Sequence, residues 1–111
     1  MKEVEREILL AFWKVHILHH AAEGSVYGQW MLNELRRHGY DLSPGTLYPI
    51  LRRMEAHGWL YSHKDEATGP RGRIDYHITR LGLDVLDQLR RQIVELLAEV
   101  AGESKHKSKK P

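Results

Sequence analysis

Apolar residues in the first part of the chain fall on two overlapping helical stripes. The stripes are Ile8, Phe12 and Val15, and Leu9, Trp13 and Ile17. Residues three or four positions apart lie on the same face of a helix with 3.6 residues per turn. This pattern predicts a helix over residues 2–22 that is buried on two sides.

A second, shorter helix is predicted over residues 28–37. The stretch AEGSVYGQ interrupts the first pattern with two glycines and a serine, and Ser25 can cap the next helix. Apolar residues then return at Met31, Leu32 and Leu35, which indicates one buried face. The stretch RHGYDLS ends this helix.

The third helix is predicted over residues 44–57 and has clear start and stop signals. Ser43 favours the position before a helix, and Pro44 suits the first helical position, where its missing N–H costs nothing. Gly58 follows the last periodic residue, as is common at helix ends. The residues predicted to face the core are Leu47, Ile50, Leu51 and Met54.

Two strands and a long helix complete the pattern. The segments WLYSHK and RIDYHIT are typical of the strands of a hairpin, with the long segment DEATGPRG between them and basic residues next to both of its ends. Beyond Thr79, a candidate cap, the apolar residues keep the alternating steps of three and four of a coiled-coil seam. A single small domain rarely needs such a seam, so we predict that it joins two copies of the chain. The predicted seam consists of Leu86, Leu89, Ile93, Leu96 and Val100.

Length and composition narrow the class of protein. The 111 residues suit one domain, and 41% hydrophobic with 29% charged residues is a globular balance. The sequence has no apolar run near the roughly 20 residues that cross a bilayer, and its N-terminus does not resemble a signal peptide. We therefore expect a cytoplasmic protein without a membrane partner. The absence of cysteine excludes disulfides, a thiol nucleophile and a cysteine-ligated zinc site.

The order of the predicted elements is that of a winged helix-turn-helix domain. The predicted fold class is mainly α with a small β-hairpin, followed by a long C-terminal dimerisation helix. We expect the DNA-binding domain over residues 1–79, the dimerisation helix over 80–102 and a basic disordered tail over 103–111. The net charge is only +2, but the pI is near 9.0 and basic residues gather in a few short segments.

The start of the third helix offers groups that suit nucleic acid. A helix N-terminus has unpaired N–H groups and a positive dipole end, and Gly45 lets a phosphate approach closely. Hydroxyls, a phenol and guanidinium groups lie on the non-core face and can reach phosphates or base edges. These groups belong to Ser43, Thr46, Tyr48, Arg52 and Arg53. The same residues also fit an ordinary, solvated helix start.

The hairpin adds a second basic element. Arg71 and Arg73 lie beside glycines and a proline at the tip, and Lys64 and His63 lie on the incoming strand. Such a tip can reach an adjacent minor groove or the phosphate backbone. Two basic elements together favour DNA binding over a loop that is charged only for solubility.

These segments closely resemble the PadR-like transcriptional regulators. The resemblance rests on SPGTLYPILRRME followed by HGWL, on the pair Tyr27-Gly28, and on RGRIDYHITRLG, and it covers about residues 8–86. It implies a dimeric DNA-binding repressor that an effector releases, of the subfamily with one short dimerisation helix. By position, it implies a DNA-facing surface made of Tyr27, Ser43, Gly45, Thr46, Tyr48 and Pro49, with Arg73 on the wing.

The chain departs from the family pattern at two places. The family usually continues Gly-Tyr-Glu where this chain has Gly28, Gln29 and Trp30, and it often has a basic residue where this chain has Ile74. The operator sequence and the affinity for it therefore cannot be carried over from relatives. The operator itself should be a pseudo-palindrome of double-stranded DNA, with half-sites roughly 10 base pairs apart.

Two sensing sites and two other functions remain open. His16, His20 and Glu23 have helical spacing that could hold a divalent metal, although a polar rim or dimer contact is the favoured explanation. A planar small-molecule effector could stack near Trp13 and Val100, where a core role for the Trp is the alternative. We expect no enzyme and no cofactor, because we recognise no nucleophile, phosphate cradle or paired carboxylates. A winged helix that binds a protein partner is the other alternative.

Overall fold

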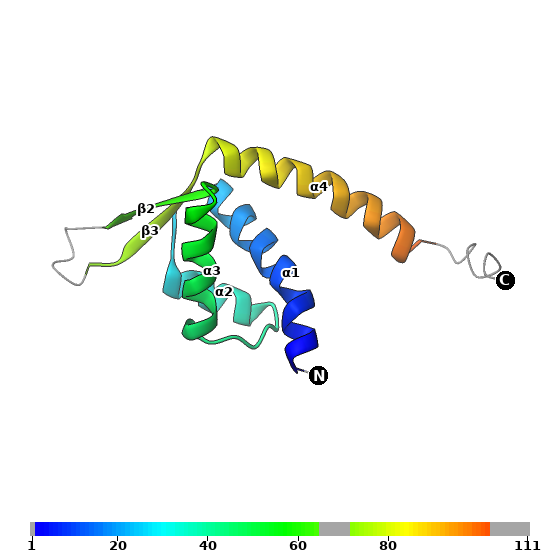
Figure 1. The fold of residues 1–111 in the computed structure, drawn as a ribbon, viewed down its shortest axis with the longest axis horizontal. Coiled ribbons are helices and arrows are strands. Elements are labelled where there is room, and N and C mark those ends of the chain that lie inside the picture. Colours follow the sequence, from blue (N-terminus) through cyan, green and yellow to red (C-terminus); the bar gives the residue numbers. More distant parts are fainter. Residues whose placement is uncertain (1, 65–71, 103–111) are drawn as a thin grey trace.

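The computed structural model describes residues 2–64 and 72–102, and it has the predicted order of helices (Figure 1). The predicted Arg71 and the tail over residues 103–111 lie outside the described residues. The predicted helix positions are confirmed to within one or two residues. The helices are α1 (Lys2–Glu23), α2 (Gly28–Arg37), α3 (Pro44–Ala56) and α4 (Arg80–Val100).

The sheet has one strand more than the sequence predicted. The expected hairpin, which we call the wing, is formed by β2 (Leu60–Lys64) and β3 (Ile74–Ile78), which run antiparallel. A two-residue strand, β1 (Val26–Tyr27), pairs with the other edge of β3, so the strand order is β1-β3-β2. The segment before α2 is thereby tied to the base of the wing, with Tyr27 opposite Asp75.

One core joins α1, α2, α3, the sheet and the start of α4. The first helix contributes Trp13 and Ile17, which are 3% and 0% exposed. Its other stripe is not covered in the protomer, because Ile8 is 58% and Phe12 49% exposed. The prediction that α1 is buried on two sides is therefore wrong for the described chain. The core residues of α2 and α3 are those predicted: Met31, Leu32, Leu35, Leu47, Ile50, Leu51 and Met54.

The start of α4 is locked to the turn that follows α3. The Thr79 hydroxyl accepts a hydrogen bond from the Gly82 N–H at 2.9 Å and donates one to the Gly58 carbonyl at 2.5 Å. Gly82 leaves no room for a side chain, since a Cβ there would overlap the backbone carbonyl of Trp59. This packing fixes the direction in which α4 leaves the domain.

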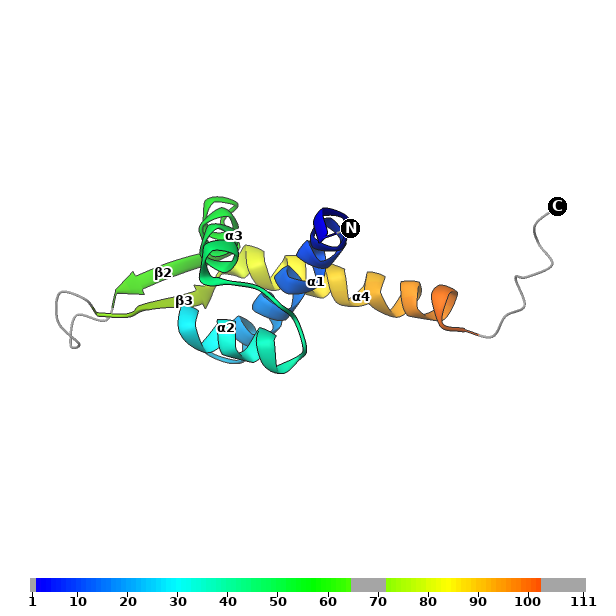
Figure 2. The ribbon, with the colours of Figure 1, turned by 90° about the horizontal axis from the view of Figure 1, so that it is seen from below.

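The second half of α4 projects away from the other elements. It runs past α1 in both ribbon views, and its C-terminal turns have no neighbouring element among the described residues (Figures 1 and 2). Leu96, Leu97 and Val100 are between 55% and 74% exposed there. Within residues 2–64 and 72–102, no helix has the length and apolar character needed to span a membrane.

Candidate nucleic-acid interface

The first turn of α3 presents its polar groups to solvent. Ser43 occupies the N-cap with extended backbone, and its carbonyl accepts hydrogen bonds from the N–H groups of Thr46 and Leu47. Its side chain makes no capping hydrogen bond and lies 3.5 Å from the Thr46 hydroxyl instead. Ser43 and Gly45 are exposed. The helix start is thus formed by the backbone, and the two hydroxyls lie beside one another instead of capping it.

Arg6 is a basic residue at this site that the sequence did not reveal. It lies on the first turns of α1, and its guanidinium donates a hydrogen bond to the Thr46 hydroxyl. A contact between residues 40 positions apart leaves no periodic signal in the sequence. Arg6 also follows the acidic residues Glu3 and Glu5, so its segment does not read as basic. The N-terminal end of α1 therefore belongs to the polar surface around the start of α3.

A hollow of about 460 Å³ separates α3 from the wing and brings four of the predicted residues together. Tyr27, Tyr48, Arg52 and Arg73 all line it. The Arg73 guanidinium lies 4.3 Å from the centre of the Tyr27 ring, and its Nε is 3.4 Å from a carboxylate oxygen of Asp75. A cation over an aromatic face is attracted by the electrons of the ring. These contacts hold Arg73 against the base of the wing.

Gly28 explains why the pair Tyr27-Gly28 matters to this hollow. A Cβ at residue 28 would lie 2.7 Å from the Tyr48 hydroxyl oxygen, so only glycine lets the phenol pack there. Tyr48 is half-buried as a result. Tyr76 lines the same hollow, and burial is the main cause that raises its pKa. The nearby Glu55 carboxylate adds to the effect.

The two neighbouring arginines of α3 lie on opposite flanks. Arg52 lines the hollow beside the wing, whereas Arg53 lies with Gly45, Thr46 and Pro49 on the flank that faces α1. Both arginines are exposed. The sequence placed them together on one non-core face, and the helix separates them because consecutive residues are about 100° apart.

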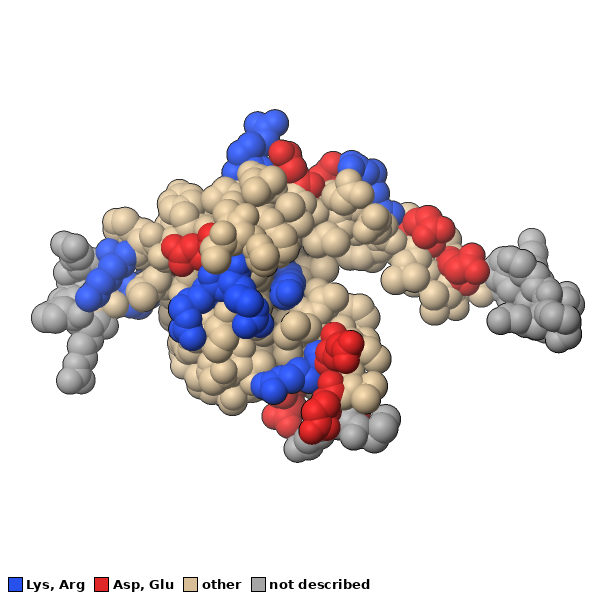
Figure 3. All heavy atoms as spheres, viewed as in Figure 1, with Lys and Arg blue, Asp and Glu red and all other residues tan. Residues whose placement is uncertain are grey.

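Basic side chains gather over α3 and at the wing (Figure 3). Lys64 is exposed at the end of β2, opposite Ile74 in the register of the sheet. Acidic side chains lie near the N-terminus of α1, where Glu3 and Glu5 occupy the first turn. The positive surface thus follows α3 and the wing, as contacts with phosphates require.

The predicted seam of α4 divides between the core and the surface. Leu86 is 1% exposed in the protomer, so it belongs to the core and offers almost no surface to a second copy. Leu89 is partly buried against the core. Ile93, Leu96 and Val100 are 43%, 55% and 74% exposed. The part of the seam open to a partner therefore begins after the first two turns of α4.

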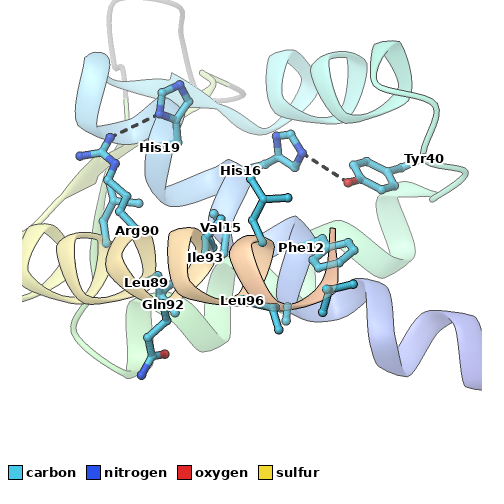
Figure 4. A pocket seen from close by; sticks show the side chains of 14 residues that line it. Phe12, Val15, His16, His19, Tyr40, Leu89, Arg90, Gln92, Ile93 and Leu96 are labelled. Atoms are coloured by element: carbon cyan, nitrogen blue, oxygen red, sulfur yellow. Dashed lines mark hydrogen bonds between the residues drawn. The ribbon is translucent and has the colours of Figure 1, made fainter. Parts of the chain in front are cut away.

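An apolar groove of about 710 Å³ runs between α1 and α4 (Figure 4). Phe12 and Val15 line it from α1, and Leu96 and Val100 from α4. Trp13 does not line it, because its side chain points into the core on the other flank of α1. The predicted effector position at Trp13 and Val100 therefore needs correction: Phe12 is the aromatic residue that shares this groove with Val100.

The histidines group differently from the predicted set. The ring nitrogens that come within 4.8 Å of one another belong to His16, His20 and His38, whereas Glu23 groups with His19 and His20. Helical spacing alone suggested His16 with Glu23, but His38 comes from the end of α2. Burial, reinforced by the charges of the neighbouring histidines, lowers the pKa of His16.

Glu34 is the charge centre beside these histidines. Its carboxylate accepts two hydrogen bonds from Arg37, at 3.1 and 2.7 Å, and one from His38 at 3.1 Å. Hydrogen bonding to Arg37 is the largest cause that lowers the pKa of Glu34 to about 2. Glu34 is therefore ionised at every physiological pH.

Known proteins are similar to this chain in sequence and in fold. Residues 17–88 match the model of the transcriptional regulator PadR-like family. The transcriptional regulator Rv3488 of Mycobacterium tuberculosis is 48% identical over 101 residues, which are 91% of this chain and 94% of that protein. Two solved structures are similar over most of their length.

The first is a PadR-like transcriptional regulator from Bacillus cereus, at 28% identity and a TM-score of 0.77, covering 86% of this chain and 93% of that one. The second is a PadR family transcriptional regulator from Eggerthella lenta, at 29% identity and a TM-score of 0.72, covering 90% and 91%. The family model spans more than half of the chain, and the surface around α3 carries the Ser-x-Gly-Thr-Leu-Tyr-Pro motif. The chain belongs to the PadR-like family of transcriptional regulators.

Proposed function

We propose that the chain is a homodimeric, DNA-binding repressor that inserts α3 into the major groove of a pseudo-palindromic operator. The observation that carries this proposal is the hollow between α3 and the wing, where the side chains of Tyr27, Tyr48, Arg52 and Arg73 converge. Helix N-termini and guanidinium groups donate the hydrogen bonds that phosphates and guanine edges accept. Such a protein acts where the DNA is, so a cytoplasmic location is part of the proposal.

The residues divide into two roles. Ser43, Thr46 and the N–H groups near Gly45 fix the register of α3 on phosphates, and Tyr48 adds its hydroxyl. Arg52 is exposed on the side of α3 that faces the wing, and we assign it the contact with a base edge. The outer phosphates are contacted by Arg53 on one flank, where Pro49 is part of the DNA-facing surface, and by Tyr27, Lys64, Arg71 and Arg73 at the wing.

Dimerisation follows from the exposed apolar surface of α4 and α1. Ile8, Phe12, Leu96 and Val100 are each about half exposed or more, and no other described element covers them. A symmetric dimer presents the same patch twice, so each contact counts twice. Two copies joined there would carry two α3 helices, which successive major grooves accept when they lie about one helical turn of DNA apart.

Release by an effector fits the groove between α1 and α4. A planar apolar ligand there would contact Phe12 from one helix and Val100 from the other. It would change the spacing of the two α3 helices only by binding one dimer geometry better than another. We therefore assign the effector to this groove and away from the DNA-binding surface.

Two arginine variants test the DNA-binding assignment. Arg73→Ala should weaken binding to operator and scrambled duplexes alike and reduce the salt dependence. Each lost phosphate contact lowers the slope of log K against log salt by about 0.9, and a dimer loses two of them. Arg52→Ala should instead reduce discrimination between the duplexes, by about 1–3 kcal/mol for a bidentate contact with guanine. The operator is found by mapping the DNA that the protein protects upstream of its own gene.

The matched control is Arg80→Ala, an exposed arginine at the start of α4 that lies outside the hollow. Equal losses on both duplexes for Arg52→Ala would move that residue to the phosphate contacts. No loss for either variant would contradict the DNA-facing assignment of α3 and the wing. In that case a winged helix that binds a protein partner would be the better function.

A further inference from the structure

Three histidines from two different elements converge beside α1. His16 and His20 lie four residues apart on α1, and His38 follows α2 at its C-terminal end. One ring nitrogen from each comes within 4.8 Å of the others. The His16 and His38 ring centres are 4.6 Å apart, and the His20 ring is stacked 6.3 Å from that of His16.

The cluster has an anionic neighbour and an unused nitrogen. The Glu34 carboxylate, whose side chain is only 11% exposed, lies 3.5 Å from Nε2 of His20 and 3.1 Å from Nε2 of His38. The His20 Nε2 is buried and makes no hydrogen bond, and the Glu34 carboxylate 3.5 Å away is its nearest opposite charge among the described residues. A buried polar atom without a partner is unusual, and a bound ion would account for it.

We propose that His16, His20 and His38 bind one divalent transition-metal ion of the Zn²⁺ type, with the Glu34 carboxylate beside it. Imidazole nitrogen is a preferred ligand of zinc, nickel and copper, and three nitrogens leave one position for a carboxylate or water. Zn–N bonds of about 2.1 Å in tetrahedral geometry place ligand nitrogens about 3.4 Å apart. The ring nitrogens therefore need to approach one another by at most about 1.4 Å, which side-chain rotation supplies.

Glu34 and its partners suit the outer part of such a site. The Glu34 carboxylate faces Nε2 of His20 and of His38, so it can either fill the fourth position on the ion or hydrogen-bond a ring whose other nitrogen binds the ion. Arg37 holds the Glu34 carboxylate in place through two hydrogen bonds. The carboxylate also offsets part of the charge of a divalent cation.

The other histidine group is a weaker site. His19, His20 and Glu23 all come from one stretch of α1, and the side chains of His19 and Glu23 are 44% and 64% exposed. The proposed site instead takes its ligands from two separate segments of the chain, and one of these ligands, His16, is half-buried. Since both groups share His20, variants of the unshared residues distinguish them.

A bound ion would link α1 to the segment that leads into α3. His38 ends α2 only a few residues before the N-cap of α3, and His16 also lines the apolar groove between α1 and α4. The ion would thus stabilise the fold, because a ligand that binds only the native state raises its stability. Metal binding is independent of the proposed DNA binding and is measured without DNA.

Two titrations of the chelator-treated protein test the site: Zn²⁺ followed by calorimetry, and Co²⁺ followed by its visible absorption. We expect one ion per chain, a rise in melting temperature, and an absorption band typical of tetrahedral Co²⁺. His16→Gln and His38→Gln should each weaken binding at least 100-fold, since even loss of an outer-shell partner such as Glu34 costs about 10–100-fold. His19→Gln and the distant His63→Gln are matched controls and should bind as the unmodified chain does.

His38 is exposed, so His38→Gln should fold normally, and circular dichroism verifies this. The absence of saturable binding to the unmodified chain would overturn the proposal. So would one-to-one binding that survives both His16→Gln and His38→Gln but is lost in His19→Gln, because the ion would then occupy the surface group. A loss of DNA binding without a loss of metal binding would count against the proposed function and not against the metal site.

Discussion

The two halves of α4 should respond to the same truncation in opposite ways. Leu86→Ala removes apolar volume from the core, where the side chain is 1% exposed. Burial of this kind is worth about 2–5 kcal/mol of unfolding free energy for a Leu→Ala change. In a domain of this size the melting temperature should fall by about 10–30 °C. Dimerisation should change only as far as the fold is lost.

Leu96→Ala should spare the fold and weaken the dimer. The side chain is 55% exposed, so about half of the 1.5–3 kcal/mol of a buried Leu remains for a partner to supply. A symmetric interface contains the residue twice, which gives about 1.6–3.3 kcal/mol, or a dissociation constant about 15- to 250-fold higher. Val94→Ala is the control, because Val94 is 68% exposed but lies outside the groove.

Sedimentation equilibrium over a concentration series measures the dissociation constants. Thermal melts followed by circular dichroism, at protein concentrations well above these constants, measure the stability of the fold. An unchanged dissociation constant for Leu96→Ala would refute the assignment of the second half of α4 to an interface. A weaker dimer without any loss of stability for Leu86→Ala would refute its place in the core.

Close contacts and burial give three further expected outcomes. Gly28→Ala should displace the Tyr48 phenol and weaken DNA binding about 30-fold, as expected when each half of the dimer loses one hydrogen bond of about 1 kcal/mol, whereas Gly24→Ala, with open space around it, should not. Gly82→Ala should lower the unfolding free energy by about 1–3 kcal/mol, measured by urea titration, because its Cβ meets backbone that cannot move aside. Burial raises the pKa of Tyr76 above 10.0, so the unfolded chain loses that proton first and stability should fall as the pH rises past 10; Tyr76→Phe should flatten this decline in melts across the alkaline range.

The helices were predictable because their signals are local. Apolar positions at steps of three and four, Pro44 at the first position of α3 and Gly58 after its end all act within one turn of the chain. Gly58 indeed adopts a φ of 83°, which favours glycine over other residues. The strand β1 was missed because two residues are too short to show an alternating pattern.

The candidate site was less predictable because distant residues build it. Arg6 reaches Thr46 across 40 residues, and His38 joins His16 from another helix. A periodic pattern indicates which residues share a face but not what covers that face. Leu86 and Leu96 therefore looked alike in the sequence, although the first is buried in the protomer and the second is exposed. The neighbours Phe12 and Trp13 likewise belong to different surfaces, the groove and the core.

The first helix connects these surfaces within one rigid element. Arg6 near its start contacts the first turn of α3, and His16, ten residues later, lies about 15 Å along the same axis at 1.5 Å per residue. Between them, Phe12 lines the groove between α1 and α4. A ligand in the groove or an ion on His16 therefore acts on α1 directly, and α1 in turn touches the residues that we assign to DNA. Coupling needs no longer pathway, but it does need two positions of α1 that differ in their affinity for the ligand.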